Sequence, residues 1–240
     1  MDQTVLIIDD DADLLQLASL LFKKAGAQVI TANDGLEGIS KFFTYQPDLI
    51  ILDVMMPGNS GFDVCQRIRQ VSEAPLIFLT ALNQEKEMLR GLAAGADDFL
   101  TKPFNPEILL ARARMVLRRT QRSNGTNGNG AAVSFSYNDG YLSIDIEKHE
   151  VLVHGKRVKL TPIEFRLLVY LARNGGKLLT FDRIIANVWG SQYQGSIDYV
   201  HVYISHLRRK IEEVSENSRY ILTVHGEGYI FEKRELVYKS

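Results

Sequence analysis

The chain has 240 residues, 45% of them hydrophobic and 24% charged, which is ordinary for a globular protein and enough for two domains. The formal net charge of −1 gives no global sign of a nucleic-acid binder, and the single cysteine, Cys65, excludes a disulfide within the chain. The N-terminus lacks the pattern of a signal peptide, and no apolar run approaches the roughly 20 residues of a membrane span. We therefore expect a cytoplasmic protein with no membrane partner.

Short apolar runs alternate with helical patterns over the first half of the chain. The predicted strands are 5–8, 29–32, 49–52, 76–79 and 99–100. The predicted helices are one from residue 14 to a stop at Gly26, then 36–45, 62–70, 84–94 and 106–119. Five strands alternating with five helices predict a parallel sheet covered on both faces, which places ligands at the carboxyl ends of its strands.

A stretch rich in Gly, Asn and Ser separates two parts of the chain with different patterns. The segment 122–132 reads RSNGTNGNGAA and predicts a flexible linker between a domain at 1–121 and a second domain at 133–240. Residues 1–130 carry 13 Lys/Arg and 16 Asp/Glu, whereas residues 131–240 carry 15 and 13, a mild shift toward positive charge. Residues 133–160 show strand-like pieces joined by turn signals at 138–140 and 154–156, typical of a small antiparallel sheet.

Three helices and a terminal hairpin are predicted after this sheet. Thr161, Pro162 and Glu164 form a strong helix start, and this helix stops at Gly175-Gly176. A second helix begins after residue 180, a third covers 197–213, and 220–224 with 229–232 form the hairpin. The expected fold is α/β, a flavodoxin-like (βα)5 parallel-sheet domain, followed by an α+β winged-helix domain.

Polar side chains follow several predicted strands of the first domain at the point where each strand ends. They are Asp9, Asp10 and Asp11 after the first strand, Asp53 after the third, Thr80 at the end of the fourth and Lys102 past the fifth. In a parallel sheet these positions meet at one edge. Carboxylates this close repel one another and favour a hard cation such as Mg²⁺, while Lys102 and Thr80 offer donors to phosphate oxygens. We expect Asp11 to cap the next helix.

This constellation resembles the receiver domain of two-component response regulators over residues 3–120. The resemblance rests on the acidic run, Asp53-Val54-Met55-Met56-Pro57 with Gly61, Thr80-Ala81 and Lys102-Pro103-Phe104. It implies that Asp53 accepts a phosphoryl group from the phosphohistidine of a sensor histidine kinase, assisted by Lys102 and Thr80. It also implies that Asp10, Asp53 and the Met55 carbonyl hold Mg²⁺, with Asp9 acting through water. Thr80 would then turn toward the phosphoryl group and Phe99 would move inward behind it.

The subtype of response regulators that this chain resembles forms homodimers on phosphorylation, through the fourth helix, fifth strand and fifth helix of the receiver domain. The charged residues available here for pairing across a two-fold axis are Arg90, Asp97, Asp98, Arg112 and Arg119. Where relatives often carry an Arg–Glu pair, this sequence has Met88 and Ile108. We expect an apolar contact between these two side chains to replace one salt bridge.

The predicted helix at 197–213 has an apolar side and a polar, cationic and aromatic side. Val200, Ile204, Leu207 and Ile211 share one face, as in a helix that enters a DNA major groove. Together with LTPIEF at 160–165, VWG at 188–190 and GEGY at 226–229, it resembles the OmpR/PhoB effector domain over about residues 134–233. The DNA-contacting residues that the resemblance implies are Tyr199, His201, Val202 and His206 toward bases, Tyr203, Ser205 and Arg208 toward phosphates, and also Arg209 and, at the wing tip, His225.

The leading interpretation is a transcription factor switched by phosphorylation, with no enzymatic activity beyond its own phosphotransfer and dephosphorylation. Its implied partners are a sensor histidine kinase, double-stranded promoter DNA, a second copy of the chain and, through residues 189–196, RNA polymerase. Two alternatives stay open. One is a Mg²⁺-dependent phosphotransfer enzyme, such as a phosphatase, that uses the same acidic cluster. The other is a DNA-binding protein whose receiver no longer uses phosphate.

Overall fold

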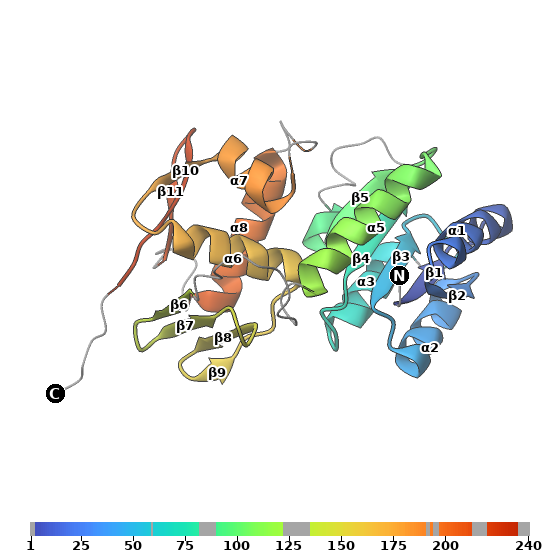
Figure 1. Ribbon diagram of the computed structural model, residues 1–240, viewed down its shortest axis with the longest axis horizontal. Helices are drawn as coiled ribbons and strands as arrows, with labels where there is room; N and C mark the ends of the chain where they lie inside the picture. Colours follow the sequence, from blue (N-terminus) through green and yellow to red (C-terminus); the bar gives the residue numbers. More distant parts are fainter. Residues whose placement is uncertain are drawn as a thin grey trace. The chain divides into compact units, whose positions relative to one another are not determined.

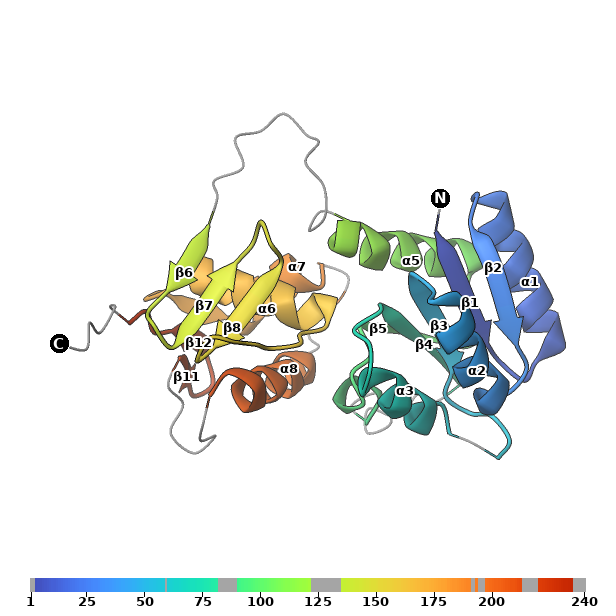
Figure 2. The same ribbon diagram turned by 90° about the horizontal axis from the view of Figure 1, so that it is seen from below.

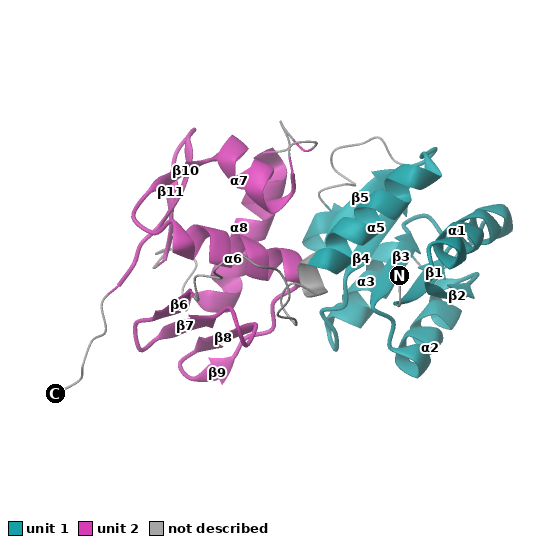
Figure 3. Cartoon of the chain, viewed as in Figure 1, with its two compact units in different colours: residues 1–120 teal, residues 121–240 magenta. Residues whose placement is uncertain are grey.

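A computed structural model describes residues 3–58, 60–81, 90–121, 135–190, 193, 197–212 and 220–234. The chain divides into two compact units, residues 1–120 and 121–240 (Figures 1 and 3). The predicted linker at 122–132 and most of the predicted helix at 84–94 lie outside the described residues.

Unit 1 contains a five-stranded parallel sheet. Its strands are β1 (Thr4–Ile8), β2 (Gln28–Ala32), β3 (Leu49–Asp53), β4 (Leu76–Thr80) and β5 (Asp98–Thr101). They lie in the order β2-β1-β3-β4-β5, and every neighbouring pair is parallel. This is the flavodoxin-like order, so the predicted fold class of the first domain is confirmed. The order reverses between β1 and β3, which is where such sheets form a ligand crevice.

The helices of unit 1 begin close to strand ends and are capped by side chains. They are α1 (Ala12–Lys24), α2 (Gly35–Tyr45), α3 (Gly61–Arg69) and α5 (Pro106–Gln121), and residues 90–93 are also helical. Asp11 caps α1 as predicted, because its carboxylate accepts the N–H groups of Asp13 and Leu14. Asp34 and Ser60 cap α2 and α3 in the same way.

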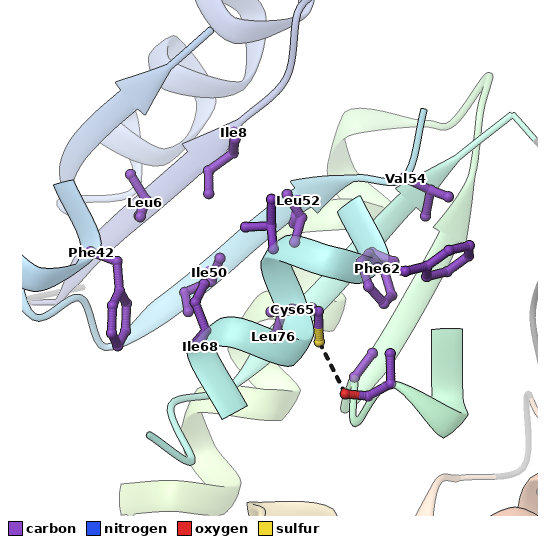
Figure 4. Packing of buried hydrophobic residues seen from close by; sticks show 14 of the residues in the cluster. Leu6, Ile8, Phe42, Ile50, Leu52, Val54, Phe62, Cys65, Ile68 and Leu76 are labelled. Atoms are coloured by element: carbon purple, nitrogen blue, oxygen red, sulfur yellow. Dashed lines mark hydrogen bonds between the residues drawn. The ribbon is translucent and has the colours of Figure 1, made fainter. Parts of the chain in front are cut away.

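Alternate side chains of the strands enter two separate cores, one on each face of the sheet. Figure 2 shows the helices that cover these faces, α2 and α3 on one and α1 and α5 on the other. Leu6, Ile50 and their neighbours pack against α2 and α3, whereas Val5, Ile51 and theirs pack against α1 and α5. Figure 4 shows the first of these cores, with the Cys65 Sγ 3.3 Å from the carbonyl oxygen of Ala94. Burial raises the pKa of the Cys65 thiol to about 12, so this cysteine packs and does not react.

Unit 2 begins with a four-stranded antiparallel sheet. Its strands are β6 (Ser136–Asn138), β7 (Leu142–Asp145), β8 (Glu150–Val153) and β9 (Lys156–Arg157), paired in that order. The two turn signals lie where the sequence placed them. Asn138 Oδ1 accepts the Gly140 N–H across the first turn, and His154 and Gly155 have positive φ in the second.

Three helices and a second sheet complete unit 2. The helices are α6 (Pro162–Arg173), α7 (Phe181–Val188) and α8 (Ile197–Ile211), and the strands are β10 (Leu178–Thr180), β11 (Ile221–Val224) and β12 (Gly228–Phe231). The predicted capping box of Thr161 and Glu164 is present at the start of α6. The predicted hairpin is β11–β12, and β12 also pairs with β10, a strand that the sequence did not predict. A Cβ at Gly228 would lie 2.0 Å from the Leu179 carbonyl oxygen, so this pairing needs glycine. The winged-helix fold is confirmed.

Candidate functional site

β1 and β3 are neighbours in the sheet, so the residues at their carboxyl ends lie side by side. Asp9 directly follows β1, and Asp53 is the last residue of β3. Both side chains are buried, whereas Asp10 is exposed. Carboxylate oxygens of Asp9, Asp10 and Asp53 all lie within 4.8 Å of one another. The structure therefore brings together the three carboxylates that the sequence placed at this edge.

Lys102 joins the two buried carboxylates from the end of β5. Its Nζ donates to Asp9 Oδ2 at 2.7 Å and to Asp53 Oδ2 at 2.8 Å. Burial alone would lower the pKa of Lys102, but the hydrogen bonds to Asp53 and Asp9 outweigh it, so the pKa is raised and the ammonium stays charged. The pKa of Asp9 is raised, because burial and the nearby Asp53 charge outweigh the hydrogen bond from Lys102. The single positive charge of Lys102 thus offsets only part of the negative charge of the neighbouring carboxylates.

The loop after β3 approaches Asp53 from another side. The Met55 N–H donates to Asp53 Oδ1 at 3.2 Å, and the Met55 side chain is 58% exposed. The chain comes back to the end of β3 at Gly61, where the Gly61 N–H donates to the Val54 carbonyl oxygen at 2.9 Å. A Cβ at Gly61 would lie 2.0 Å from the Asp53 carbonyl oxygen, so only glycine allows α3 to begin this close to β3.

The three carboxylates fit a divalent metal ion. They offer hard oxygen ligands with more negative charge than Lys102 can neutralise, which is the donor set that Mg²⁺ and Ca²⁺ prefer. Asp10 is exposed, so the site is open to water and to an incoming oxygen ligand. The predicted role of the Met55 carbonyl as a ligand stays a prediction.

Thr80 ends β4 at the same edge of the sheet and is buried, while Phe99 of β5 is half-buried. Both line a cavity of about 10 Å³, together with Val54, Phe62, Phe78, Gly91, Leu92 and Ala96. Such a volume accommodates no more than about one water. An inward movement of Phe99 therefore requires its neighbours to shift, and the switch role of Thr80 and Phe99 stays a prediction.

Three residues predicted to pair across a dimer axis, Asp97, Asp98 and Arg112, are bonded within unit 1, which corrects that expectation. Asp97 is buried, and its Oδ2 accepts from Arg69 Nη2 and from the Leu76 N–H, both at 3.0 Å. Asp98 is also buried and forms an ion pair with Arg112 of the same chain at 2.9 Å. Buried carboxylates that already have partners are not available to a second subunit without rearrangement.

The remaining residues of the predicted dimer face are only partly described. Arg90 is exposed, and its guanidinium lies 5.2 Å from the centre of the Phe62 ring. Ile108 is 47% exposed on α5. Met88 and the side chain of Arg119 lie outside the described residues, so the apolar contact between Met88 and Ile108 stays a prediction.

α8 has the predicted apolar face, because Val200, Ile204, Leu207 and Ile211 are all fully buried. Among the residues expected to contact DNA, the exposed ones are His201, Ser205, Arg209 and His225, and the half-buried ones are Val202 and Arg208. The accessible surface of the helix therefore carries a cation, a hydroxyl and an imidazole, which are donors suited to a nucleic acid.

Tyr199, Tyr203 and His206 are buried, which corrects their expected contacts with bases and phosphates. The rings of Tyr199 and Tyr203 pack on Trp189, with centroids 6.3 and 5.3 Å away. His206 Nδ1 lies 3.7 Å from Glu164 Oε1, and Glu164 Oε2 accepts from Lys210 Nζ at 2.6 Å. α6 and α7 pack against α8, so its buried arc is wider than the apolar residues alone indicate.

The exposed side of α8 is connected to the hairpin. The Arg208 guanidinium donates to the Ile221 carbonyl oxygen and, at 2.8 Å, to Thr223 Oγ1. His201 Nδ1 lies 2.7 Å from the Tyr229 hydroxyl, and the Phe181 ring contacts both rings. Neither Tyr229 nor Phe181 is predictable as a neighbour of His201, because nothing in the spacing of these residues along the chain shows that they meet.

Within the ranges that the structure describes, no helix is both long and apolar enough to cross a bilayer. Two family models match the chain. Residues 5–114 match a response regulator receiver domain, and residues 155–231 match the C-terminal part of transcriptional regulatory proteins. The first match contains the acidic site and the second contains α8.

Known proteins match nearly the full length. The DNA-binding dual master transcriptional regulator RpaA of Synechocystis sp. is 41% identical over 231 residues, covering 95% of this chain and 94% of that protein. The DNA-binding response regulator MtrA of Mycolicibacterium paratuberculosis is 37% identical and covers 95% and 98%. A solved structure of the Thermotoga maritima OmpR/PhoB homologue DrrB is 34% identical over 97% of this chain and 100% of that chain, with a TM-score of 0.49. The chain belongs to the DNA-binding response regulators of the OmpR/PhoB type, in which a receiver domain is joined to a C-terminal transcriptional regulatory domain.

Proposed function

We propose that Asp53 accepts a phosphoryl group from a sensor histidine kinase, and that phosphorylation promotes dimerisation and promoter binding. The observation that carries this proposal is the environment of Asp53. Its carboxylate is buried at the crevice of the sheet, bonded to Lys102 and within 4.8 Å of two further carboxylates. A carboxylate held this way is preorganised for a charged ligand.

The transfer forms an acyl phosphate. An Asp53 carboxylate oxygen attacks phosphorus, the phosphorus–nitrogen bond of the phosphohistidine breaks, and the imidazole leaves with the bonding pair and takes up a proton. Lys102 Nζ already lies 2.8 Å from Asp53 Oδ2, so its charge is in place to stabilise the phosphoryl oxygens. Thr80 at the end of β4 offers a hydroxyl to the same oxygens. When bound, Mg²⁺ on Asp10, Asp53 and the Met55 carbonyl, with Asp9 through water, would supply further charge neutralisation.

The chemistry of the chain is confined to its own phosphorylation and dephosphorylation. Dimerisation would use the side of unit 1 that carries Arg90 and Ile108, and DNA binding would use the exposed side of α8 with Arg209 and Ser205. RNA polymerase is a partner by resemblance only, since 191, 192 and 194–196 lie outside the described residues. A regulator with these partners acts in the cytoplasm.

The test compares wild type, Asp53→Asn and Asp63→Asn in binding to fragmented genomic DNA with Mg²⁺, with and without acetyl phosphate. Asp63 is an exposed aspartate on α3, so its replacement is a matched control for the loss of one charge. We expect the phosphodonor to tighten binding of wild type and Asp63→Asn and to leave Asp53→Asn unchanged. Equal responses of all three proteins would show that Asp53 is not the control point. Equal binding with no response in any of them would favour a regulator that does not use phosphate.

A further inference from the structure

His201 lies on the exposed side of α8, and one of its ring nitrogens is already bonded inside the protein. Nδ1 lies 2.7 Å from the hydroxyl oxygen of Tyr229, a residue of β12 that is 3% exposed. Because Nδ1 faces the hairpin, the other nitrogen, Nε2, is the ring atom left to meet a ligand. A neutral imidazole carries a proton on only one of its two ring nitrogens. The hydrogen bond that one nitrogen makes determines whether the other nitrogen carries that proton.

The direction of this hydrogen bond follows from the buried hydroxyl. Within the described residues the contact with His201 is the one hydrogen bond that the Tyr229 side chain makes. If His201 donated, the Tyr229 proton would be left in a buried site without an acceptor. A separation of 2.7 Å is also typical of a hydroxyl donor and short for an N–H donor.

The surroundings keep Tyr229 protonated and in place. Burial raises the pKa of Tyr229, against the opposing effect of the nearby Arg208 charge, so the hydroxyl keeps its proton at neutral pH. The Phe181 ring packs edge-on against Tyr229 and against His201, with centroids 5.9 and 5.1 Å away. The Arg208 guanidinium lies 5.6 Å from the centre of the Tyr229 ring.

We propose that Tyr229 fixes neutral His201 in the tautomer protonated on Nε2, so that α8 presents a hydrogen-bond donor at this position and selects an acceptor on DNA. The acceptor is a guanine or thymine oxygen or a purine N7 in the major groove, or a phosphate oxygen. A cytosine or adenine amino group is disfavoured at the same place. Tyr229 is therefore a positioning residue and His201 the residue that touches DNA. This inference rests on the proposed use of the exposed side of α8 for DNA.

The first measurement is ¹⁵N NMR of the histidine rings in the full chain without DNA, at pH 8 where an ordinary imidazole is neutral. The His201 signals are assigned by their loss in His201→Gln. We expect Nε2 to be protonated in wild type, and Tyr229→Phe to yield a mixture of tautomers. Tyr220→Phe is the matched control, since it removes another buried tyrosine hydroxyl, one bonded to Asp139, and should leave His201 unchanged. A wild-type ring protonated on Nδ1 would overturn the inference.

The second measurement selects binding sites from a randomised DNA library with wild type, Tyr229→Phe and Tyr220→Phe. A base contact predicts that Tyr229→Phe loses preference at one position of the half-site. A phosphate contact predicts instead a uniform loss of affinity, about twofold if the two tautomers become equally populated, with the preferences unchanged. If Tyr229→Phe matches wild type in both respects, His201 is not an oriented donor to DNA. If wild type itself selects no sequence, the proposed use of α8 fails, whichever tautomer the NMR spectrum shows.

Discussion

The buried aspartates of the acidic site, Asp9 and Asp53, and the buried Asp139 of unit 2 have opposite surroundings. Asp139 accepts from the hydroxyls of Tyr137 and Tyr220 and from the N–H groups of Tyr141 and Leu142, at 2.6 to 3.0 Å. Burial would raise the pKa of Asp139, but these four hydrogen bonds outweigh it and the pKa is lowered. In unit 1, by contrast, burial and a neighbouring carboxylate raise the pKa of Asp9.

The difference separates a carboxylate that serves the fold from one that is held for a ligand. Asp139 is supplied with donors from β6, from the β6–β7 turn and from Tyr220 next to β11, so its charge stabilises the contact between distant segments. Asp9 and Asp53 share a single lysine and repel one another, an arrangement that costs stability until another cation arrives.

Replacing Asp139 should have the largest effect. Asp139→Ala leaves two buried hydroxyls and two N–H groups without an acceptor, so we expect unit 2 to lose about 2 to 4 kcal/mol at neutral pH. The only tryptophan, Trp189, is buried in unit 2, so its fluorescence during denaturation reports on that unit. Asp182→Ala, which removes an exposed aspartate from α7, is the control.

The loss of stability in Asp139→Ala should depend on pH. Because the folded-state pKa of Asp139 is lowered, its contribution is fully present above the ordinary value of 3.8 and is lost as pH falls through the lowered folded value. The gap in stability between wild type and Asp139→Ala should therefore narrow as pH falls below 3.8. A gap that is constant with pH, or a loss no greater than that of Asp182→Ala, would remove the distinction between the two acidic sites.

Adding Mg²⁺ should have an intermediate effect, and only on unit 1. At a concentration ten times the dissociation constant, binding to the folded state stabilises it by about 1.4 kcal/mol. Labelling of the only cysteine, buried Cys65, measures unfolding of unit 1 while Trp189 measures unit 2 in the same sample. Asp10→Asn alters an exposed carboxylate of the predicted metal site without disturbing the core and should abolish the gain. A gain that persists in Asp10→Asn, or one that appears equally in unit 2, would contradict a metal site at Asp10.

The smallest effect is expected from Asp53→Asn in the absence of metal. This change leaves Lys102 paired with Asp9 and removes the like charge beside it, so unit 1 should keep its stability or gain up to about 1 kcal/mol. Because the folded-state pKa of Asp9 is raised, its favourable contribution is present below the ordinary value and is lost as pH rises through the folded value. Any gain from Asp53→Asn should therefore be greatest at neutral pH. If Asp53→Asn instead lowers the free energy of unfolding of unit 1 by more than about 1 kcal/mol, Asp53 stabilises the fold and the comparison with Asp139 fails.

The acidic site was predictable because topology alone determines where strand ends meet. Once five strands alternate with five helices, Asp9, Asp53 and Lys102 must gather at one edge, whatever their rotamers. The hydrogen bonds from Lys102 to both carboxylates were not predictable, because they depend on side-chain geometry in the loop after β5.

The residues of α8 were harder to assign, because the period of a helix gives the direction of a side chain but not what covers it. The four aliphatic residues marked the centre of the buried face correctly. The edges of that face depend on contacts between segments far apart in sequence. Trp189 packs on Tyr203 at one of these contacts, and Glu164 lies beside His206 at the other. The same limit applied to Asp97, which bonds Arg69 of α3. Charged and aromatic residues at a helix edge or a strand start remain ambiguous without the packing.

Glu164 joins the beginning of one helix to the end of another. Its Oε2 accepts the Thr161 N–H and Lys210 Nζ, so the first turn of α6 is tied to the last turn of α8. Helix ends ordinarily fray first and exchange their amide hydrogens within the fastest class. Here the Thr161 amide can exchange only when Glu164 releases it. The two helix ends should therefore open as a single cooperative segment, and any ligand that holds α8 should slow amide exchange at the start of α6.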